Sequence, residues 1–229
     1  MSSKRQSRAA PAPKRVLLVE DHPLMREGVA QWIRRAPDLE ICGEAETAAE
    51  ALRAVEKHKP DLVLTDISLP GRNGIEFIKD LRALHPDVPV LVLSMHDEAL
   101  YAGRALRAGA RGYVMKRAGG DRVVAAIREV LAGRMALGPE AATHLLEEYA
   151  GRSPRAGHSP LAVLTDREFE IFQLIGEGRT NREVAQQLHL SHKTVETHRL
   201  SIRRKLKLKT TAELIRYAVQ YAEKEAAGD

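Results

Sequence analysis

The chain has 229 residues, of which 44% are hydrophobic, and a formal net charge of +5 at pH 7. It lacks a run of about 18 apolar residues, and its basic first 15 residues are not followed by the apolar segment of a secretory signal. We therefore expect neither a membrane protein nor a secreted one, and the single cysteine, Cys42, excludes an internal disulfide.

Four segments are predicted along the chain. Residues 1–14 form a disordered basic arm, because the first 15 residues carry five Lys or Arg side chains and no acid. Residues 15–132 form an α/β domain, and residues 133–160 form a linker in which Pro139 starts a short helix. Residues 161–229 form an all-α domain of four helices.

The α/β domain alternates between strand and helix patterns. Apolar runs predict five strands, at 16–19, 40–45, 62–65, 90–94 and 112–115. Helical spacing of apolar residues predicts five helices, at 24–35, 48–57, 75–84, 98–108 and 123–132. Five strand–helix pairs are typical of a doubly wound (βα)5 fold, in which helices cover both faces of a parallel sheet.

Polar side chains follow four of these strands. Glu20 and Asp21 follow the first strand, Asp66 the third and Lys116 the fifth, while Ser94 ends the fourth. Ligands of open parallel sheets bind beyond the carboxyl ends of the strands, so we expect these side chains to meet there. Three carboxylates in one pocket repel each other unless a cation such as Mg²⁺ neutralises them, and Lys116 and Ser94 could contact phosphate oxygens.

Residues 15–132 resemble a bacterial response-regulator receiver domain. The resemblance lies in Val19-Glu20-Asp21-His22-Pro23, Asp66-Ile67-Ser68-Leu69-Pro70-Gly71, Ser94 and Gly112-Tyr113-Val114-Met115-Lys116. It implies that Asp66 accepts a phosphoryl group from a histidine kinase or a small phosphodonor, and that Mg²⁺ is held by Glu20, Asp21, Asp66 and the Ser68 carbonyl. It also implies that Ser94 and Lys116 bind the phosphoryl oxygens, that Tyr113 is a rotameric switch that moves inward, and that Ser68 and His96 set the phosphoryl lifetime.

The C-terminal segment carries the signals of a helix-turn-helix. Three Thr…Glu capping boxes, at Thr165, Thr180 and Thr210, mark helix starts, and Ser191 is an N-cap candidate. Residues 191–209 hold seven Lys or Arg and one acid, Glu196, which points to a polyanionic partner. On the helix that follows Ser191, one face and its basic rim are predicted to meet DNA; these residues are Lys193, Glu196, Thr197, Arg199, Leu200, Arg203 and Arg204.

This segment resembles the LuxR-type helix-turn-helix over residues 161–225. The resemblance lies in Leu164-Thr165-Asp166-Arg167-Glu168, Gly178-Arg179-Thr180-Asn181-Arg182-Glu183-Val184-Ala185, Thr194-Val195-Glu196-Thr197-His198 and Lys205-Leu206. Lys207 replaces the usual glycine, so a strained left-handed backbone is expected there. Phe169 replaces a usual polar residue, so its ring could be exposed as a contact for the receiver or another protein, or could fold onto the core. The last helix is expected to form a dimer contact through Leu214, Ile215, Ala218 and Val219, although a single buried face would explain the same pattern.

Together the two resemblances imply a cytoplasmic response regulator of the LuxR-tailed (NarL/FixJ) class. Its expected partners are a sensor histidine kinase, double-stranded DNA and, when phosphorylated, a second copy of the chain; RNA polymerase is a further candidate. The receiver is expected to cover the recognition helix until Asp66 is phosphorylated, and the only chemistry expected is phosphoryl acceptance followed by slow self-dephosphorylation. The alternative is a DNA-binding regulator whose receiver signals by protein or ligand contact without phosphate. A phosphatase is disfavoured, because Ser68 stands where a second aspartate would be needed.

Overall fold

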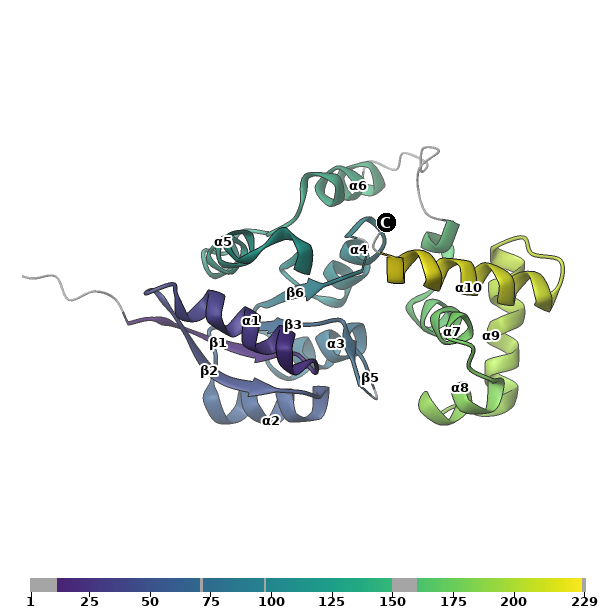
Figure 1. Cartoon of the computed structure of the whole chain (residues 1–229), viewed down its shortest axis with the longest axis horizontal. Coiled ribbons are helices and arrows are strands. Elements are labelled where there is room, and N and C mark those ends of the chain that lie inside the picture. Colours follow the sequence, from purple (N-terminus) through teal and green to yellow (C-terminus); the bar gives the residue numbers. More distant parts are fainter. Residues whose placement is uncertain (1–11, 71, 97, 150–159, 228–229) are drawn as a thin grey trace, which may run out of the picture.

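The computed structural model describes residues 12–70, 72–96, 98–149 and 160–227. An N-terminal α/β domain and a C-terminal helical domain lie side by side (Figure 1). Within the described part of the chain, no helix is long and apolar enough to cross a membrane. The expected basic arm at residues 1–11 and most of the expected linker, 150–159, fall outside the described residues.

The N-terminal domain is built on a five-stranded parallel sheet. Its strands are β1 (Lys14–Val19), β2 (Leu39–Ala45), β3 (Leu62–Thr65), β6 (Val90–Ser94) and β7 (Gly112–Met115). They are ordered β2-β1-β3-β6-β7, and every neighbouring pair is parallel. All residues of β3 and β6 are buried, as expected for central strands covered on both faces. The predicted fold class is therefore confirmed.

Helices cover both faces of the sheet (Figure 1). They are α1 (Pro23–Arg34), α2 (Ala48–His58), α3 (Gly74–Leu84), α4 (Glu98–Ala108) and α5 (Gly120–Leu131). One apolar cluster joins α1 and α5 to one face of the sheet, and the other joins α2, α3 and α4 to the opposite face. Because side chains alternate along each strand, β1 contributes to both clusters. Val16 and Leu18 belong to the first, and Leu17 and Val19 belong to the second.

Three details differ from the sequence prediction. Strand β1 begins at Lys14, the last residue of the predicted arm. The Lys14 amide donates to the Asp38 carbonyl, and its ammonium pairs with Asp61 at 2.9 Å. A small hairpin, β4 (Ser68–Leu69) with β5 (Arg72–Asn73), follows the third strand. The start of the predicted linker also belongs to the sheet edge, since the Tyr113 amide donates to the Ala136 carbonyl.

The predicted linker helix is present as α6 (Pro139–Tyr149), and it packs against α4. After a short 3-10 turn, η2 (Pro160–Val163), the C-terminal domain contains α7 (Asp166–Gly176), α8 (Asn181–Gln187), α9 (His192–Lys205) and α10 (Thr211–Ala227). The capping boxes at Thr165 and Thr180 are both formed, and Ser191 caps α9. These side chains fix where α7, α8 and α9 begin.

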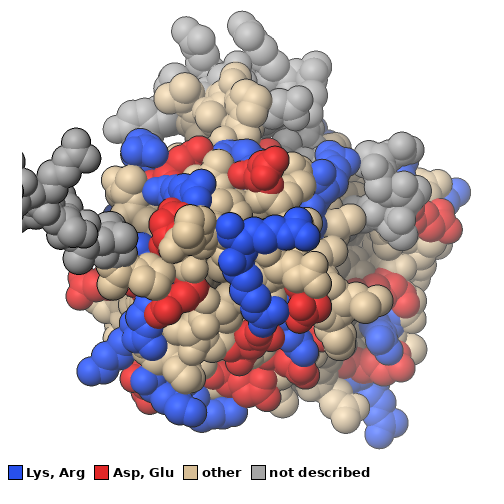
Figure 2. Space-filling model, turned by 60° about the vertical axis from the view of Figure 1, so that its left-hand side comes forward, with Lys and Arg blue, Asp and Glu red and all other residues tan. Residues whose placement is uncertain are grey.

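The two domains differ in how their charged side chains are distributed. Basic and acidic side chains intermingle over the face brought forward in Figure 2, which is the left-hand side of Figure 1 and carries the N-terminal domain. The sequence of residues 16–132 has nearly balanced charge, with 16 basic and 18 acidic side chains. The concentrated basic sequence lies instead in residues 191–209, on α9 and the turn after it. The polyanion partner is therefore expected at the C-terminal domain.

Candidate functional site

Strand register brings the polar side chains of the N-terminal domain to one edge of the sheet. Val19 on β1 pairs with Thr65 on β3, so Glu20 and Asp66 leave the sheet side by side. Ser94 on β6 pairs with Met115 on β7, so Lys116 emerges beside them. The convergence predicted from the strand ends is confirmed, because parallel strands all end on the same side of the sheet.

Asp66 lies in a buried charge network. The Lys116 ammonium lies 2.8 Å from Asp66 Oδ2 and 2.7 Å from Glu20 Oε2, and all three side chains are at most 5% exposed. The other Asp66 oxygen, Oδ1, accepts from the Ile67 amide at 2.6 Å. Burial opposes the charge on Lys116, but the Asp66 and Glu20 carboxylates outweigh it and raise the pKa of the ammonium. Lys116 therefore stays protonated and holds the Asp66 carboxylate in place.

The acidic cluster beside this network can hold a hard cation. Ligand atoms of Glu20, Asp21 and His22 all lie within 4.8 Å of one another. Asp21 is more exposed than Glu20 and Asp66, and its Oδ1 lies 2.9 Å from His22 Nδ1. An oxygen-rich, partly hydrated corner of this kind suits Mg²⁺. Ser68, the fourth expected ligand, lies in β4 directly after this edge.

The two predicted switch residues meet at His96. Ser94 Oγ accepts from the His96 amide at 3.2 Å, and the Tyr113 hydroxyl donates to the His96 carbonyl at 2.9 Å. The Tyr113 ring is fully buried. The ring therefore already lies inside the domain in this structure, and a movement of Tyr113 that follows phosphorylation stays a prediction.

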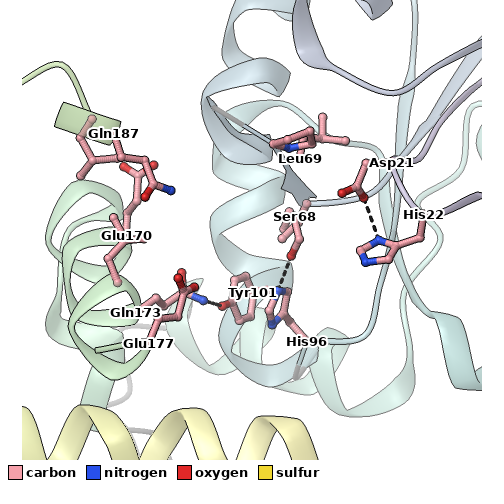
Figure 3. A pocket seen from close by; sticks show the side chains of 14 residues that line it. Asp21, His22, Ser68, Leu69, His96, Tyr101, Glu170, Gln173, Glu177 and Gln187 are labelled. Atoms are coloured by element: carbon pink, nitrogen blue, oxygen red, sulfur yellow. Dashed lines mark hydrogen bonds and ion pairs between the residues drawn. The ribbon is translucent and has the colours of Figure 1, made fainter. Parts of the chain in front are cut away.

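A cleft of about 340 Å³ separates the mouth of this site from the C-terminal domain. Ser68, His96 and Tyr101 line one wall, and Glu170, Gln173 and other residues of α7 and α8 line the other (Figure 3). Tyr101 Oη accepts from Gln173 Nε2 at 2.5 Å across the cleft. The C-terminal domain thus stands directly in front of the loops that surround Asp66.

A second set of contacts between the domains centres on Arg104 of α4. Its guanidinium donates to the carbonyls of Leu161 and Leu164 and to Asp166 Oδ1, at 2.9–3.1 Å, and lies 4.6 Å from the centre of the Phe169 ring. We call this set of five residues the interdomain latch. Both alternatives for Phe169 apply, because its buried ring lies against Arg104 of the receiver and also packs on Phe172 and Tyr221 of its own domain. Arg104 was missed, because an arginine on a helix gives no sequence signal of a buried partner.

The predicted DNA-reading side chains of α9 lie on an exposed face. Lys193, Glu196, Thr197 and Leu200 are all exposed and form what we call the recognition face. Val195 and Ile202, on the opposite side, are fully buried in the domain core. The domains meet through α7, whereas α9 lies behind it (Figure 1). The prediction that the receiver covers the recognition helix is therefore wrong for this arrangement.

Two of the predicted rim arginines have partners within the domain. Arg199 donates to Asn181 Oδ1 at 2.5 Å, which ties α9 to the start of α8. Arg203 donates to the Lys209 carbonyl in the turn before α10. Arg204, by contrast, is exposed. We therefore expect Arg204 to contact phosphates, while Arg199 and Arg203 position the elements around the recognition face.

Glu168 holds α9 against α7. Its carboxylate accepts from Lys205 Nζ at 2.6 Å, Ser201 Oγ at 2.7 Å and the Thr165 amide at 2.8 Å. Burial opposes its charge, but the hydrogen bonds from Lys205, Ser201 and Thr165 outweigh burial and lower the pKa of Glu168 to about 2. The N-terminal capping box of α7 therefore also fixes the tilt of the recognition helix.

The predicted dimer residues of α10 divide into two groups. Leu214 and Ala218 are buried against the domain's own core, so their assignment to a dimer surface is wrong in this structure. Ile215 is 43% exposed and Val219 is half-buried. These two side chains lie one helical turn apart and remain available for a dimer contact.

Comparisons with known proteins agree with this geometry. Residues 16–128 match the family model of the response regulator receiver domain, and residues 162–218 match that of bacterial regulatory proteins of the luxR family. The chain is 33% identical to the oxygen regulatory protein NreC of Staphylococcus carnosus, covering 90% of this chain and 97% of the relative. It is 35% identical to the response regulator GacA of Pseudomonas viridiflava, covering 93% of this chain and 99% of the relative.

Solved structures show the same two-domain fold. RcsB of Salmonella enterica serovar Typhimurium, bound to the promoter rprA in the presence of the phosphomimetic BeF3-, superposes with a TM-score of 0.71 at 23% identity. The match covers 90% of this chain and 98% of that one. With the acidic pocket, the buried lysine and the exposed recognition face, these likenesses place the chain in the LuxR-tailed (NarL/FixJ) class of two-component response regulators, which are DNA-binding proteins.

Proposed function

We propose that Asp66 accepts a phosphoryl group and that this modification activates the protein for transcriptional control. The observation that carries the proposal is the buried network in which Lys116 bridges Asp66 and Glu20. An ammonium held beside an acceptor carboxylate is placed to neutralise the charge of an incoming phosphoryl oxygen. The phosphoryl donor is proposed to be a sensor histidine kinase.

We propose Mg²⁺ as the cofactor of this step. Glu20, Asp21, Asp66 and the Ser68 carbonyl would hold the ion, which supplies positive charge to the oxygens of the transferred group. The donor set is all oxygen, and Asp21 is open enough to keep water in the coordination shell. Ser94 and Lys116 would contact the remaining phosphoryl oxygens. No enzymatic turnover is proposed beyond slow loss of the phosphoryl group from Asp66.

Phosphorylation by acetyl phosphate tests the proposal. Wild-type protein with Mg²⁺ should gain one phosphoryl group by intact mass, EDTA should prevent the gain, and Asp66→Asn should abolish it. Asp61→Asn is the matched control, because the two aspartates flank the same strand: Asp61 precedes β3 and Asp66 follows it. Asp61 pairs with Lys14, far from the acceptor network, and its substitution should leave labelling intact. Equal labelling of Asp66→Asn and wild type would place the acceptor elsewhere.

The output is proposed to be binding of double-stranded DNA by a homodimer in the cytoplasm, where RNA polymerase is a further candidate partner. The exposed recognition face and the local basic excess support DNA as the ligand. The related fold of RcsB was solved on promoter DNA with a phosphomimetic, which supports the same link between phosphorylation and DNA. Ile215 and Val219 are the proposed dimer contacts.

A further inference from the structure

An apolar groove lies between α4 and α6, and the residues that line it are distinct from those of the phosphoacceptor site and the recognition face. Its volume is about 930 Å³, within the range of roughly 300–1,000 Å³ that is typical of small-molecule sites. Most of the lining is apolar and comes from α4, from the connector before α6 and from α6 itself; these residues include Leu106, Met135, Leu137, Leu145 and Leu146. Leu146 is 71% exposed and Met135 is 54% exposed, so the groove is open to solvent.

The way in which α6 is anchored fixes the groove. The Gly138 amide, just before α6, donates to the Glu98 carboxylate at the start of α4 at 2.6 Å, and a side chain at Gly138 would collide with that carboxylate. Two residues earlier, the Ala136 carbonyl accepts from an amide of β7. Gly103 of α4 and Ala142 of α6 line the groove between these helices, and their small size leaves the space unfilled. The groove is therefore a consequence of how the chain connects α5 to α6.

Arg107 of α4 supplies the charge of the groove. It is exposed, and among the described lining residues it is the only one with a charged side chain. A carbon added at the Cβ position of Gly103 would lie 3.4 Å from Arg107 Nη1, so the guanidinium folds back along α4 over this glycine. A guanidinium can donate two parallel hydrogen bonds to a carboxylate. This part of the groove therefore suits one anionic group.

The groove uses a different face of α4 from the one that meets the C-terminal domain. Tyr101 and Arg104 contact α7, whereas Gly103, Leu106 and Arg107 share another face at three- and four-residue spacing. Helix α6 lies along this other face (Figure 1). An occupant of the groove would therefore bridge α4 and α6 without displacing the contacts with α7.

We propose that this groove binds a monomeric medium-chain aliphatic carboxylate, with the chain against the apolar lining and the carboxylate on Arg107. The proposal is independent of phosphorylation at Asp66. The apolar lining disfavours a polar metabolite, because buried polar groups without partners are costly. The single guanidinium favours a carboxylate over a phosphate monoester, whose charge of roughly −1.5 to −2 at pH 7 would be only partly compensated.

Decanoate is the probe, added to the full-length protein below its micellar concentration. Titration calorimetry measures affinity and stoichiometry, and NMR of methyl-labelled methionines locates the ligand. The Met135 signal should shift and saturate at one decanoate per chain, whereas the signal of Met95, which is 61% exposed outside the groove, should stay in place. Octanoate, shorter by two methylenes, should bind roughly tenfold more weakly. Saturable binding that leaves Met135 unshifted would place the site elsewhere and overturn the proposal.

The role of the charge is tested separately. Decyltrimethylammonium carries the same chain with the opposite charge and should bind more weakly than decanoate; equal affinity would overturn the assignment of an anionic ligand. Arg107→Gln should weaken decanoate binding about fivefold, as expected for a partly exposed ion pair. The matched control is Arg111→Gln, an exposed arginine just after α4 that does not line the groove, and it should keep wild-type affinity. Equal weakening in both variants would indicate a general attraction of anions to this surface and overturn the role of Arg107.

A substitution that fills the groove tests its location. Ala142→Phe should prevent decanoate binding, and Ala83→Phe, at an exposed alanine of α3, is the matched control that should not. Leu146→Glu is the second variant if Ala142→Phe disturbs α6, because Leu146 is already exposed and a carboxylate there should repel the ligand. Thermal melts followed by circular dichroism check that each variant is folded. Wild-type affinity in folded Ala142→Phe or Leu146→Glu would overturn the proposal, as would a lack of saturable decanoate binding by the wild type.

Discussion

Replacing Glu168 by glutamine should loosen the recognition helix. Glu168 is 4% exposed, and its carboxylate receives hydrogen bonds from Lys205, Ser201 and Thr165. A carboxyl whose pKa falls from 4.5 to about 2 on folding contributes roughly 3 kcal/mol to the free energy of unfolding at pH 7, since one pKa unit corresponds to about 1.4 kcal/mol. Glutamine keeps the shape of the side chain but loses the charge, so most of this contribution should disappear.

Hydrogen exchange of the α9 amides in the full-length chain measures the effect, because it reports the free energy of local opening of this helix. Glu183→Gln is the matched control, since Glu183 occupies the same capping-box position at the start of α8 but is exposed. It should change α9 protection far less. Equal loss of protection in the two variants would mean that Glu168 acts only as a helix cap.

The pH dependence gives an independent check on the same carboxyl. Because the pKa of Glu168 is lowered in the folded state, its contribution is fully present above pH 4.5 and is lost as the pH falls toward 2. The stability difference between wild type and Glu168→Gln should therefore shrink over that interval. A difference that stays constant from pH 7 to pH 2.5 would refute an electrostatic origin.

Three further substitutions address the C-terminal domain. Lys207→Gly should raise the free energy of unfolding of that domain by roughly 0.5–1 kcal/mol in urea titrations, because Lys207 has φ of 57° and glycine adopts this region without strain; a loss of stability would contradict this reading. Arg204→Ala should weaken binding to all DNA sequences and reduce the salt slope by about one, whereas Arg203→Ala should mainly lower the melting temperature; the reverse pattern would exchange their roles. Thr197→Ala should change preference among operators by roughly 1–3 kcal/mol, and unchanged preference in a binding-site selection would exclude it from base contact.

The sequence alone determined the architecture and the acceptor site. Apolar runs and helical spacing predicted the five strands and the helices, because burial on both faces of a parallel sheet imposes those patterns locally. The sequence also predicted that Asp66, Glu20 and Lys116 lie close together, since the carboxyl ends of parallel strands lie on one side of the sheet. The strained backbone expected at Lys207 is also confirmed, because the position after a helix end requires a left-handed conformation.

Only the tertiary structure decided how the two domains meet. Arg104 and Tyr101 lie on a helix whose sequence does not reveal that its outer face is buried by α7, and a contact across 62 residues leaves no local periodicity. Leu214 and Ala218 have the same helical spacing as Ile215 and Val219, so spacing could not separate the core stripe from the exposed one. In each case the missing information is which surface another element covers, which depends on packing between distant segments rather than on the residues of one helix.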